Sequence, residues 1–450
     1  MPGVITDNDA QYAYDIVKTI CTEVGPGLPG SSQERERAAI LKGELESHLG
    51  AGNVAVEEFT VATWAGLGAM RLSALFMLIA ALLNISIGRF TGVSPWLTAG
   101  AALAFSILSP LPFVLEDVFG FELLDPFFKK KQSVNVVGTL RKPGTRSVSR
   151  LLILSGHHDS AAEITWLRLL GDVKRFFIRS GSHDSASQNG WLCLLDYGFY
   201  FLTATLFIGF ITMLAMSIIQ LAGVITGDAG TVRLGTLGWA VLAYPLVPSI
   251  LFALFFNLER KDGGTVPGAV DNLSASALAV AMCRFLVKNP STIPPDTEIQ
   301  FVSFGSEEAG LRGSRRYVER HLDELKRLDA RLLNFEMVAH PEIAICTSDV
   351  NGTVKNSPGM VESAVAAAER AGVPYKVKPA SLGIATDASP FSQAGLKATT
   401  LLPFKVPQQQ VAFYHQKWDG PEILTIEPLL NVLKLSFEWV RNGGEKELKP

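Results

Sequence analysis

Residues 150–160 have the sequence RLLILSGHHDS, an apolar run that ends in two histidines and an aspartate. The run Leu151–Ser155 is short, apolar and followed by a glycine, which predicts a buried strand. Ionisable side chains directly after a buried strand indicate the edge of an open α/β sheet, where such folds bind ligands. This stretch therefore predicts a sheet strand and, at His157 and Asp159, the start of a functional site.

The same order of strand and ionisable residues recurs along the chain. A strand predicted at Glu298–Phe304 precedes Glu307 and Glu308, and one predicted at Arg331–Ala339 contains Glu336. Imidazole and carboxylate groups are typical ligands of zinc. Three further candidates lie in predicted loops, namely Asp271, Asp387 and His415. Each motif alone is weak, and the ordered set carries the evidence.

Strands and helices alternate in the parts of the chain that look soluble, which predicts an α/β fold with a mainly parallel sheet. We expect Ser133–Leu140 and Arg150–Ser155 to be neighbouring strands joined by a turn at Lys142–Thr145. The other predicted elements are two helices within 8–50, strands at Asn53–Thr63 and Ala398–Pro403, and helices at Ala275–Leu286, Tyr317–Leu328, Val361–Ala371 and Pro421–Val440.

Apolar residues are concentrated in four uncharged stretches. A helix needs roughly 17–25 apolar residues to cross a bilayer core of about 30 Å. The stretches are Leu72–Gly88, Phe90–Leu115, Tyr197–Gly227 and Leu234–Leu258. They predict four transmembrane helices in two hairpins, so that residues 1–70, 116–196 and 259–450 lie on one side of the membrane. Lys and Arg near the predicted spans are commoner on that side, which predicts that it is cytoplasmic.

Composition limits the alternatives for this chain of 450 residues. Apolar residues make up 48% and charged residues 18%, which excludes intrinsic disorder. The net charge of −3 argues against a nucleic-acid partner. Four scattered cysteines favour buried thiols in a reducing compartment over disulfides or a cysteine zinc site. The N-terminal residues have no basic and apolar pattern, so we expect no cleavable signal peptide.

Residues 163–179 (EITWLRLLGDVKRFFIR) are basic and amphipathic and precede the second hairpin. This pattern is typical of a helix that lies in the membrane interface. An ordinary helix of a soluble domain fits the pattern equally well, and the sequence leaves the choice open.

The ordered motifs are His157-x-Asp159-Ser160, Gly-Ala-Val-Asp-Asn-Leu-Ser at 268–274, Glu-Glu-Ala-Gly-Leu-Arg-Gly-Ser at 307–314, Glu336, Asp387 near Pro-Phe, and Tyr-His at 414–415. This set resembles the co-catalytic zinc exopeptidases typified by bacterial leucyl aminopeptidase. The wider group includes glutamate carboxypeptidase and glutaminyl cyclases. The resemblance covers about residues 8–68, 133–160 and 268–440, and it implies a mixed sheet flanked by helices.

The resemblance implies two zinc ions held by five ligands. Asp271 would bridge the ions, with His157 and Glu336 at one ion and Glu308 and His415 at the other. Relatives often have aspartate where this chain has Glu336. Glutamate keeps the carboxylate but extends one carbon further, so the geometry or metal preference of that site can differ.

Three more residues receive supporting roles from the resemblance. Glu307 is implied as the general base, Asp159 as the partner that fixes the tautomer of His157, and Asp387 as a loop carboxylate outside the ligand set. The implied function is a membrane-embedded, zinc-dependent aminopeptidase that hydrolyses peptide bonds with a water between the ions. The alternatives are a glutaminyl cyclase-like acyltransferase with a single zinc, a carboxypeptidase or dipeptidase, and a non-catalytic membrane scaffold.

The predicted organisation is one peptidase domain with two insertions. Residues 1–68, 117–160 and 266–450 would form the peptidase domain, residues 69–116 the first transmembrane hairpin, and residues 161–265 the interfacial helix with the second hairpin. Because the second insertion leaves from a predicted metal-ligand loop, we expect a peptide substrate that is hydrophobic or membrane-proximal, with the lipid bilayer as the other partner.

Overall fold

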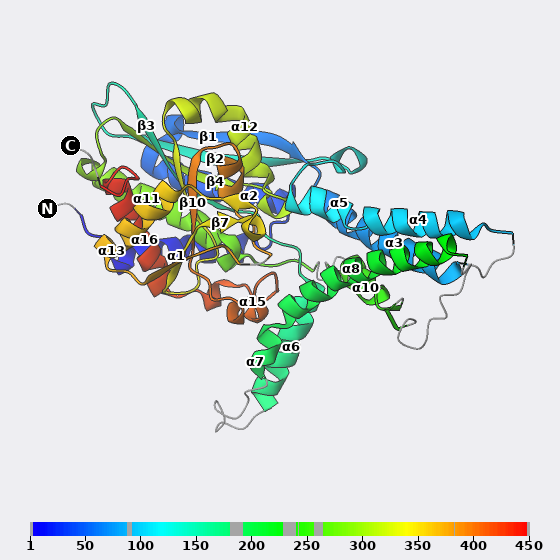
Figure 1. The fold of residues 1–450 in the computed structure, drawn as a ribbon. Coiled ribbons are helices and arrows are strands. Elements are labelled where there is room, and N and C mark those ends of the chain that lie inside the picture. Colours follow the sequence, from blue (N-terminus) through cyan, green and yellow to red (C-terminus); the bar gives the residue numbers. More distant parts are fainter. Residues whose placement is uncertain are drawn as a thin grey trace. The chain divides into compact units, whose positions relative to one another are not determined.

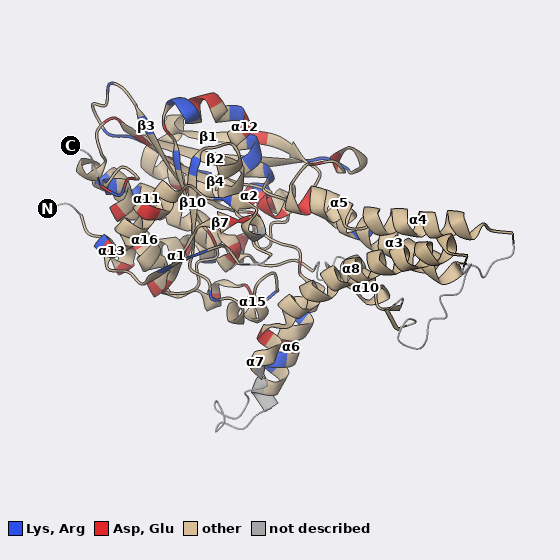
Figure 2. Ribbon diagram, viewed as in Figure 1, with Lys and Arg blue, Asp and Glu red and all other residues tan. Residues whose placement is uncertain are grey.

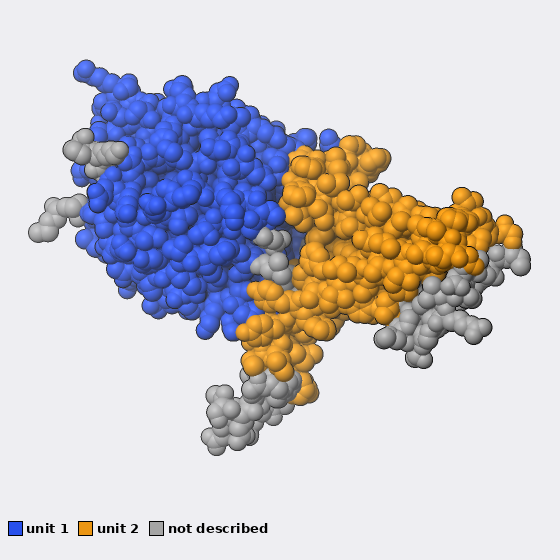
Figure 3. All heavy atoms as spheres, viewed as in Figure 1, with its two compact units in different colours: residues 1–63, 130–163, 258–450 blue, residues 64–129, 164–257 orange. Residues whose placement is uncertain are grey.

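A computed structural model of the protein describes residues 3–87, 92–180, 192–227, 240–241, 243–255, 264–381 and 383–447. The chain divides into two compact units (Figure 3). Unit 1 consists of Met1–Thr63, Lys130–Glu163 and Leu258–Pro450, and unit 2 consists of Trp64–Lys129 and Ile164–Asn257. Unit 1 is therefore assembled from three separate parts of the sequence.

Unit 1 contains an eight-stranded mixed sheet in the order β1-β2-β4-β3-β5-β10-β6-β9 (Figure 1). The central neighbours β4-β3-β5-β10 are parallel, whereas β1-β2, β2-β4 and β10-β6 are antiparallel. The strands are β1 (Val54–Val61), β2 (Lys131–Arg141), β3 (Arg150–His157), β4 (Thr297–Phe304), β5 (Arg331–Phe335), β6 (Ile343–Cys346), β9 (Tyr375–Lys378) and β10 (Lys397–Leu402). A separate hairpin pairs β7 (Ser348–Asp349) with β8 (Val354–Lys355). The predicted fold class is confirmed.

The predicted pairing of β2 with β3 is wrong, because β4 lies between them. Crossing one strand requires a connection that spans about 10 Å, and the loop from Arg141 to Arg150 is long enough for this. β4 then pairs antiparallel with β2 and parallel with β3. The strand predicted at Arg331–Ala339 is also shorter than expected, since β5 ends at Phe335.

Helices cover both faces of the sheet. On one face α11 (Ser274–Lys288) packs on β3 and β4, and α1 (Asp7–Glu23), α2 (Ser32–Leu49) and α16 (Ile426–Arg441) surround it. The other face carries α12 (Arg312–Arg327) and α14 (Ala388–Gln393). The remaining helices of unit 1 are α13 (Pro358–Ala371), which packs against α16, and α15 (Gln408–Ala412).

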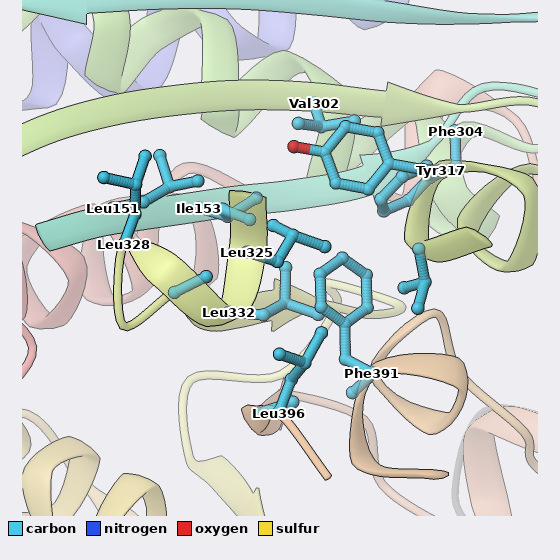
Figure 4. Packing of buried hydrophobic residues seen from close by; sticks show 14 of the residues in the cluster. Leu151, Ile153, Val302, Phe304, Tyr317, Leu325, Leu328, Leu332, Phe391 and Leu396 are labelled. Carbon is cyan, nitrogen blue, oxygen red and sulfur yellow. The ribbon is translucent and has the colours of Figure 1, made fainter. Parts of the chain in front are cut away.

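A dense apolar core fills the layer between the sheet and α12 and α14 (Figure 4). Alternate residues of β3, Leu151 and Ile153, point into this core, as the period of a strand requires. Leu332 of β5 is fully buried there, beside Phe391 of α14. This packing fixes the three central strands in register, and their register positions the site.

The ends of the second insertion are paired within unit 1. Ala162 and Thr265 form an antiparallel bridge, and the Val266 amide donates to the Ala161 carbonyl at 3.3 Å. Unit 1 therefore holds the two ends of the insertion together by its own backbone hydrogen bonds.

Unit 2 is largely helical and apolar. Its helices are α3 (Ala65–Ser86), α4 (Pro95–Leu108), α5 (Leu111–Phe113), α6 (Thr165–Ser180), α7 (Leu192–Asp196), α8 (Gly198–Ile225) and α10 (Leu246–Ala253). Segments Ala65–Ser86, Pro95–Val118 and Tyr200–Ile225 are long and apolar enough to cross a membrane. A fourth segment with these properties, Ala269–Lys288, lies in unit 1 and is almost entirely buried there as α11 and the turn before it.

The predicted spans correspond to these helices in part. Leu72–Gly88, Phe90–Leu115 and Tyr197–Gly227 overlap the three long helices of unit 2. The predicted span Leu234–Leu258 lies partly outside the described residues, and its described part contains α10. The predicted turn at Arg89 and most of the predicted loop after Thr226 also lie outside them.

Buried polar side chains connect three helices of unit 2. The Asn84 side-chain amide of α3 donates to Ser217 Oγ of α8 at 2.8 Å, and Ser217 Oγ lies 2.7 Å from Ser106 Oγ of α4. All three side chains are buried. Small and polar residues of this kind join helices where apolar surroundings offer no other hydrogen-bond partner.

Exposed apolar side chains are distributed unequally between the units. Within the described ranges, the exposed large hydrophobic residues of unit 1 are only Val4, Val56 and Val377, and all others belong to unit 2. A large exposed apolar surface indicates an interaction site rather than a surface in contact with water.

Truncating Leu332 to alanine is expected to lower the free energy of unfolding of unit 1 by about 2–5 kcal/mol, because it opens a cavity in the core. The measurement is denaturant unfolding of the detergent-solubilised protein, followed by a signal from unit 1. Val56→Ala, at an exposed position of β1, is the matched control and should stay within about 0.5 kcal/mol. Equal effects of the two variants would contradict the described core.

Candidate metal centre

The parallel strands bring three of the predicted residues to one edge of the sheet. In the β3–β4 register His157 pairs with Phe304, and in the β3–β5 register Ser155 pairs with Asn334. The carboxyl ends of the three strands therefore coincide. Glu336 directly follows β5, and Glu307 lies in a short turn after β4.

The carboxylate of Asp271 lies between two histidines. Its Oδ1 is 3.4 Å from His157 Nε2, and its Oδ2 is 3.2 Å from His415 Nε2. Glu336 Oε1 lies 3.6 Å from His157 Nε2, and Glu308 Oε1 lies 3.3 Å from His415 Nε2. The two oxygens of Asp271 thus face two separate donor sets, each of one histidine and one glutamate.

These distances fit zinc. Two ligand atoms that each lie about 2.1 Å from a tetrahedral zinc ion are about 3.4 Å apart. Within each donor set, the potential ligand atoms lie within 4.8 Å of one another. His157 Nε2 and Glu308 Oε1 are buried and have no hydrogen-bond partner among the described residues. Buried nitrogen and oxygen atoms with unused lone pairs, directed at a common point, are the donors that a metal ion requires.

Glu307 lies close to the donor set of His157 and Glu336 but is not one of its ligands, and it is not a ligand of the donor set of His415 and Glu308 either. Its Oε2 lies 3.6 Å from His157 Nε2, and it groups with His157 and Glu308. Asp387 and Asp159 belong to neither of the two donor sets. The structure thus brings together all six residues that the sequence predicts as ligands or base, and it leaves the two supporting carboxylates outside the ligand groups.

The centre holds an excess of buried negative charge. Burial raises the pKa of Glu307 well above its usual value; His157 opposes the shift, while the carboxylates of Glu308 and Asp387 add to it. Burial also raises the pKa of Glu336 to about 8. For His415, burial lowers the pKa, but the carboxylates of Glu308 and Asp271 outweigh burial and raise it to about 10. Divalent cations offset an excess of this kind, so the charge agrees with the geometry.

The loop that carries Asp271 is fixed from two sides. Asp419 accepts hydrogen bonds from the backbone amides of Val270 at 2.7 Å and of Asp271 at 3.1 Å. The Asn272 side chain donates to the Phe335 carbonyl at 3.1 Å, and its oxygen accepts from the amide that follows Glu336 at the same distance. The loop and the end of β5 are therefore connected by two hydrogen bonds.

Asp159 connects the other two loops of the centre. Its Oδ1 and Oδ2 accept from the backbone amides of Glu307 at 3.1 Å and Glu308 at 3.0 Å. Its Oδ1 also lies 3.2 Å from His157 Nδ1. One buried carboxylate thus contacts the histidine of one donor set and orders the turn that supplies the glutamate of the other.

Asp387 is the residue before α14 and lies close enough to the centre to raise the pKa of Glu307 and of Glu336. Its side chain is fully buried, and burial raises its pKa to about 7. Both carboxylate oxygens lack a hydrogen-bond partner within the described ranges. It therefore adds negative charge near Glu307 and Glu336 without joining their ligand groups.

Two charged residues of α2 support the centre and were missed by the sequence analysis. Glu34 Oε1 accepts from the amide and hydroxyl of Ser306 at 2.7 and 2.8 Å and from the Ser133 hydroxyl at 2.8 Å. Arg37 donates to the carbonyls of His158 and Pro267 at 3.1 and 2.7 Å. Both side chains are fully buried. In the sequence they look like charges on the surface of a helix, and no motif distinguishes them.

Comparison with known proteins agrees with this geometry. Residues 258–440 match the model of Peptidase family M28. Aminopeptidase YwaD of Bacillus subtilis (strain 168) is 33% identical over 187 residues, which is 41% of this chain and 39% of that protein. The match thus spans about two fifths of this curated relative.

Solved structures give the same fold at low identity. A zinc aminopeptidase from Bacillus subtilis superposes with a TM-score of 0.50 at 16% identity, covering 95% of this chain and 93% of that one. An Acidobacteriales bacterium glutaminyl cyclase gives 0.51 at 13% identity, covering 98% and 95%. These solved structures show the fold alone. The match of residues 258–440 to the model of Peptidase family M28 confirms the resemblance seen in the motifs.

Replacing Glu34 with alanine is expected to destabilise unit 1 by more than about 2 kcal/mol, because it leaves several buried donors without an acceptor. Glu36→Ala, at an exposed position of the same helix, is the matched control and should be nearly neutral. Thermal unfolding and zinc retention against a chelator are measured together. The support assigned to Glu34 is wrong if the two variants behave alike in both assays.

Proposed function

We propose that the protein is a membrane-embedded zinc aminopeptidase that removes the N-terminal residue of a peptide. The observation that carries the proposal is the position of Asp271, whose two oxygens face two donor sets. This arrangement favours two zinc ions, with Asp271 shared between them. His157 and Glu336 would hold one ion, and Glu308 and His415 the other.

Bound zinc would supply Lewis acidity, polarising the scissile carbonyl and lowering the pKa of water. Glu307 is the group best placed to move protons. Its carboxylate is buried, lies beside His157 without belonging to either donor set, and has a pKa raised by burial. We assign it to accept a proton from the attacking water and to pass it to the leaving amine. The carboxylate of Asp159 accepts a hydrogen bond from the backbone amide of Glu307 and so fixes the position of that residue.

The choice of an aminopeptidase rests on the relatives. Aminopeptidase YwaD of Bacillus subtilis (strain 168) is named an aminopeptidase, and it is 33% identical to this chain over 187 residues. The glutaminyl cyclase neighbour shares the fold at 13% identity and supports nothing about the reaction. A single-zinc acyltransferase would not need both donor sets, and a non-catalytic scaffold would not need Glu307 beside them. Substrate preference and zinc content therefore distinguish these alternatives from the aminopeptidase.

We also propose that unit 2 anchors the enzyme in a bilayer. Three long apolar helices and the concentration of exposed apolar side chains in this unit support the proposal. The bias of Lys and Arg toward the segments outside the predicted hairpins favours a cytoplasmic peptidase unit. The buried polar contacts of Asn84 and Ser217 fit an anchor, since both groups are occupied in holding helices together.

Replacing Glu307 with alanine is expected to lower kcat by about 100- to 10,000-fold while zinc stays bound, because a general base contributes about this factor. Turnover and metal content are measured on aminoacyl amides with small and hydrophobic side chains, N-blocked peptides and N-terminal glutaminyl peptides. Glu319→Ala, on the outer side of α12, is the matched control.

The same panel separates the alternatives. Hydrolysis limited to free-amine substrates supports the aminopeptidase. Cyclisation of glutaminyl peptides with one bound zinc would show that the protein is an acyltransferase. Turnover of N-blocked peptides alone would indicate a carboxypeptidase. A protein without metal and without turnover would be a scaffold on a peptidase fold.

Asp271→Ala is expected to remove all bound zinc, since each donor set then loses a carboxylate oxygen. Metal content of the purified variant is measured beside its thermal unfolding, so that loss of metal is distinguished from loss of the fold. Retention of the full zinc content in a folded variant contradicts the shared position of Asp271.

A further inference from the structure

The exposed face of α6 is apolar. Its exposed side chains among those described are Leu169, Val173, Phe176 and Phe177, with exposed fractions of 42%, 43%, 66% and 41%. These positions are spaced i, i+4, i+7 and i+8, so they form one stripe along the helix. A helix on the surface of a soluble domain shows the opposite pattern, with polar residues outward.

The opposite face of α6 is already packed within unit 2. Leu167 is fully buried, the Trp166 indole donates to the Leu251 carbonyl at 2.9 Å, and the Thr165 amide donates to the Phe255 carbonyl at 3.0 Å. The helix is thus held in place by its first turn. The apolar stripe lies on the other face of the helix, where its side chains are exposed.

The charges of α6 are mainly basic (Figure 2). Arg168, Lys174 and Arg175 outnumber the single Asp172 among the described side chains. Each of them is partly buried. Lys174 pairs with Asp196 of α7, and Asp172 lies 3.7 Å from Arg168 and 4.0 Å from Arg175. Basic residues that flank an apolar stripe are typical of helices lying on anionic membranes.

A second segment of unit 2 repeats the combination. Phe119, Phe121, Leu123 and Phe127 are exposed by 42%, 59%, 53% and 82%. Three consecutive lysines at 129–131 follow them in the sequence. Aromatic side chains next to lysines are enriched where a protein meets the headgroups of a bilayer.

We propose that α6 and the segment 119–127 lie in the headgroup region of an anionic bilayer leaflet, with their apolar side chains inserted and their basic residues beside lipid phosphates. Continuity with the predicted spans favours lipid over a protein partner. Segment 119–127 follows the span that ends at Val118, and α6 lies before α8 in the same unit. Within this unit α6 runs in a different direction from α3 and α4 (Figure 1).

The inference rests on the proposed membrane insertion of unit 2, and it does not depend on peptidase activity. The experiment uses the full chain with Cys21 and Cys193 replaced by serine and the buried Cys283 and Cys346 kept, and one introduced cysteine carries an environment-sensitive fluorophore. The test positions are Phe176→Cys and Leu169→Cys. Ile211→Cys, exposed on α8, reports insertion of the span, and Val377→Cys, exposed on unit 1, reports a water-facing surface. Each protein is placed in nanodiscs containing phosphatidylserine or only neutral lipid.

The expected result is shielding at positions 176 and 169 from a water-soluble quencher, with strong quenching by lipids spin-labelled at the headgroup. Position 211 should be quenched by lipids labelled deep in the acyl chain, and position 377 by neither. Arg175→Ala should weaken the association with anionic spin-labelled lipid about fivefold, because a basic residue near the surface contributes about 1 kcal/mol.

Three results would overturn the inference. Probes at 176 and 169 that stay open to the soluble quencher would mean that the stripe faces water. Shielding without quenching by lipid would mean that a protein surface covers it. Identical shielding in neutral and anionic nanodiscs would remove the role of anionic lipid. Absence of acyl-chain quenching at position 211 would instead show that the proposed insertion of unit 2 is wrong.

Discussion

The architecture of unit 1 depends on placing several carboxylates within a few ångströms of one another in a buried position. Asp271 is at the centre of this arrangement, with His157 on one side and His415 on the other. Burying uncompensated charge is costly. Hydrogen bonds fix the backbone of the loops that carry these groups, and the groups face one another in an arrangement suited to a cation. Asp159, Asp419 and Asn272 provide this fixation through backbone amides and carbonyls.

The sheet makes the cluster possible because three parallel strands end at the same edge. Packing of Leu151, Leu332 and their neighbours under α12 and α14 fixes the register of these strands. His157, Glu307 and Glu336 lie at or directly after the ends of these strands, so the register of the strands brings them together without a long connecting loop. The N-terminal part of α2 completes the arrangement, since the buried side chains of Glu34 and Arg37 hydrogen-bond the backbone at Ser306 and His158.

The insertion of unit 2 into unit 1 is compatible with this order because its ends are closed locally. The bridge between Ala162 and Thr265 joins the two points where the chain leaves and returns. The entropic cost of closing a loop rises only slowly with its length, so a large insertion costs little more than a short one once its ends are paired. The loops of His157 and Asp271 can therefore be adjacent in space although a whole unit separates them in sequence.

The sequence by itself indicated the fold class, the long apolar helices of unit 2 and six residues that lie together in the structure. Periodicity and uncharged length are local properties, and the ordered motifs place ionisable residues at strand ends. Only the tertiary structure decided which strands are neighbours. It places β4 between β2 and β3, and it adds β6 and β9, short strands near one edge of the sheet. Strand pairing and the burial of Glu34, Arg37 and Asp419 depend on contacts between residues far apart in the chain, and no local pattern encodes them. The exposed apolar stripe of α6 is also a tertiary result, because the sequence shows two faces and only packing shows which face is already covered.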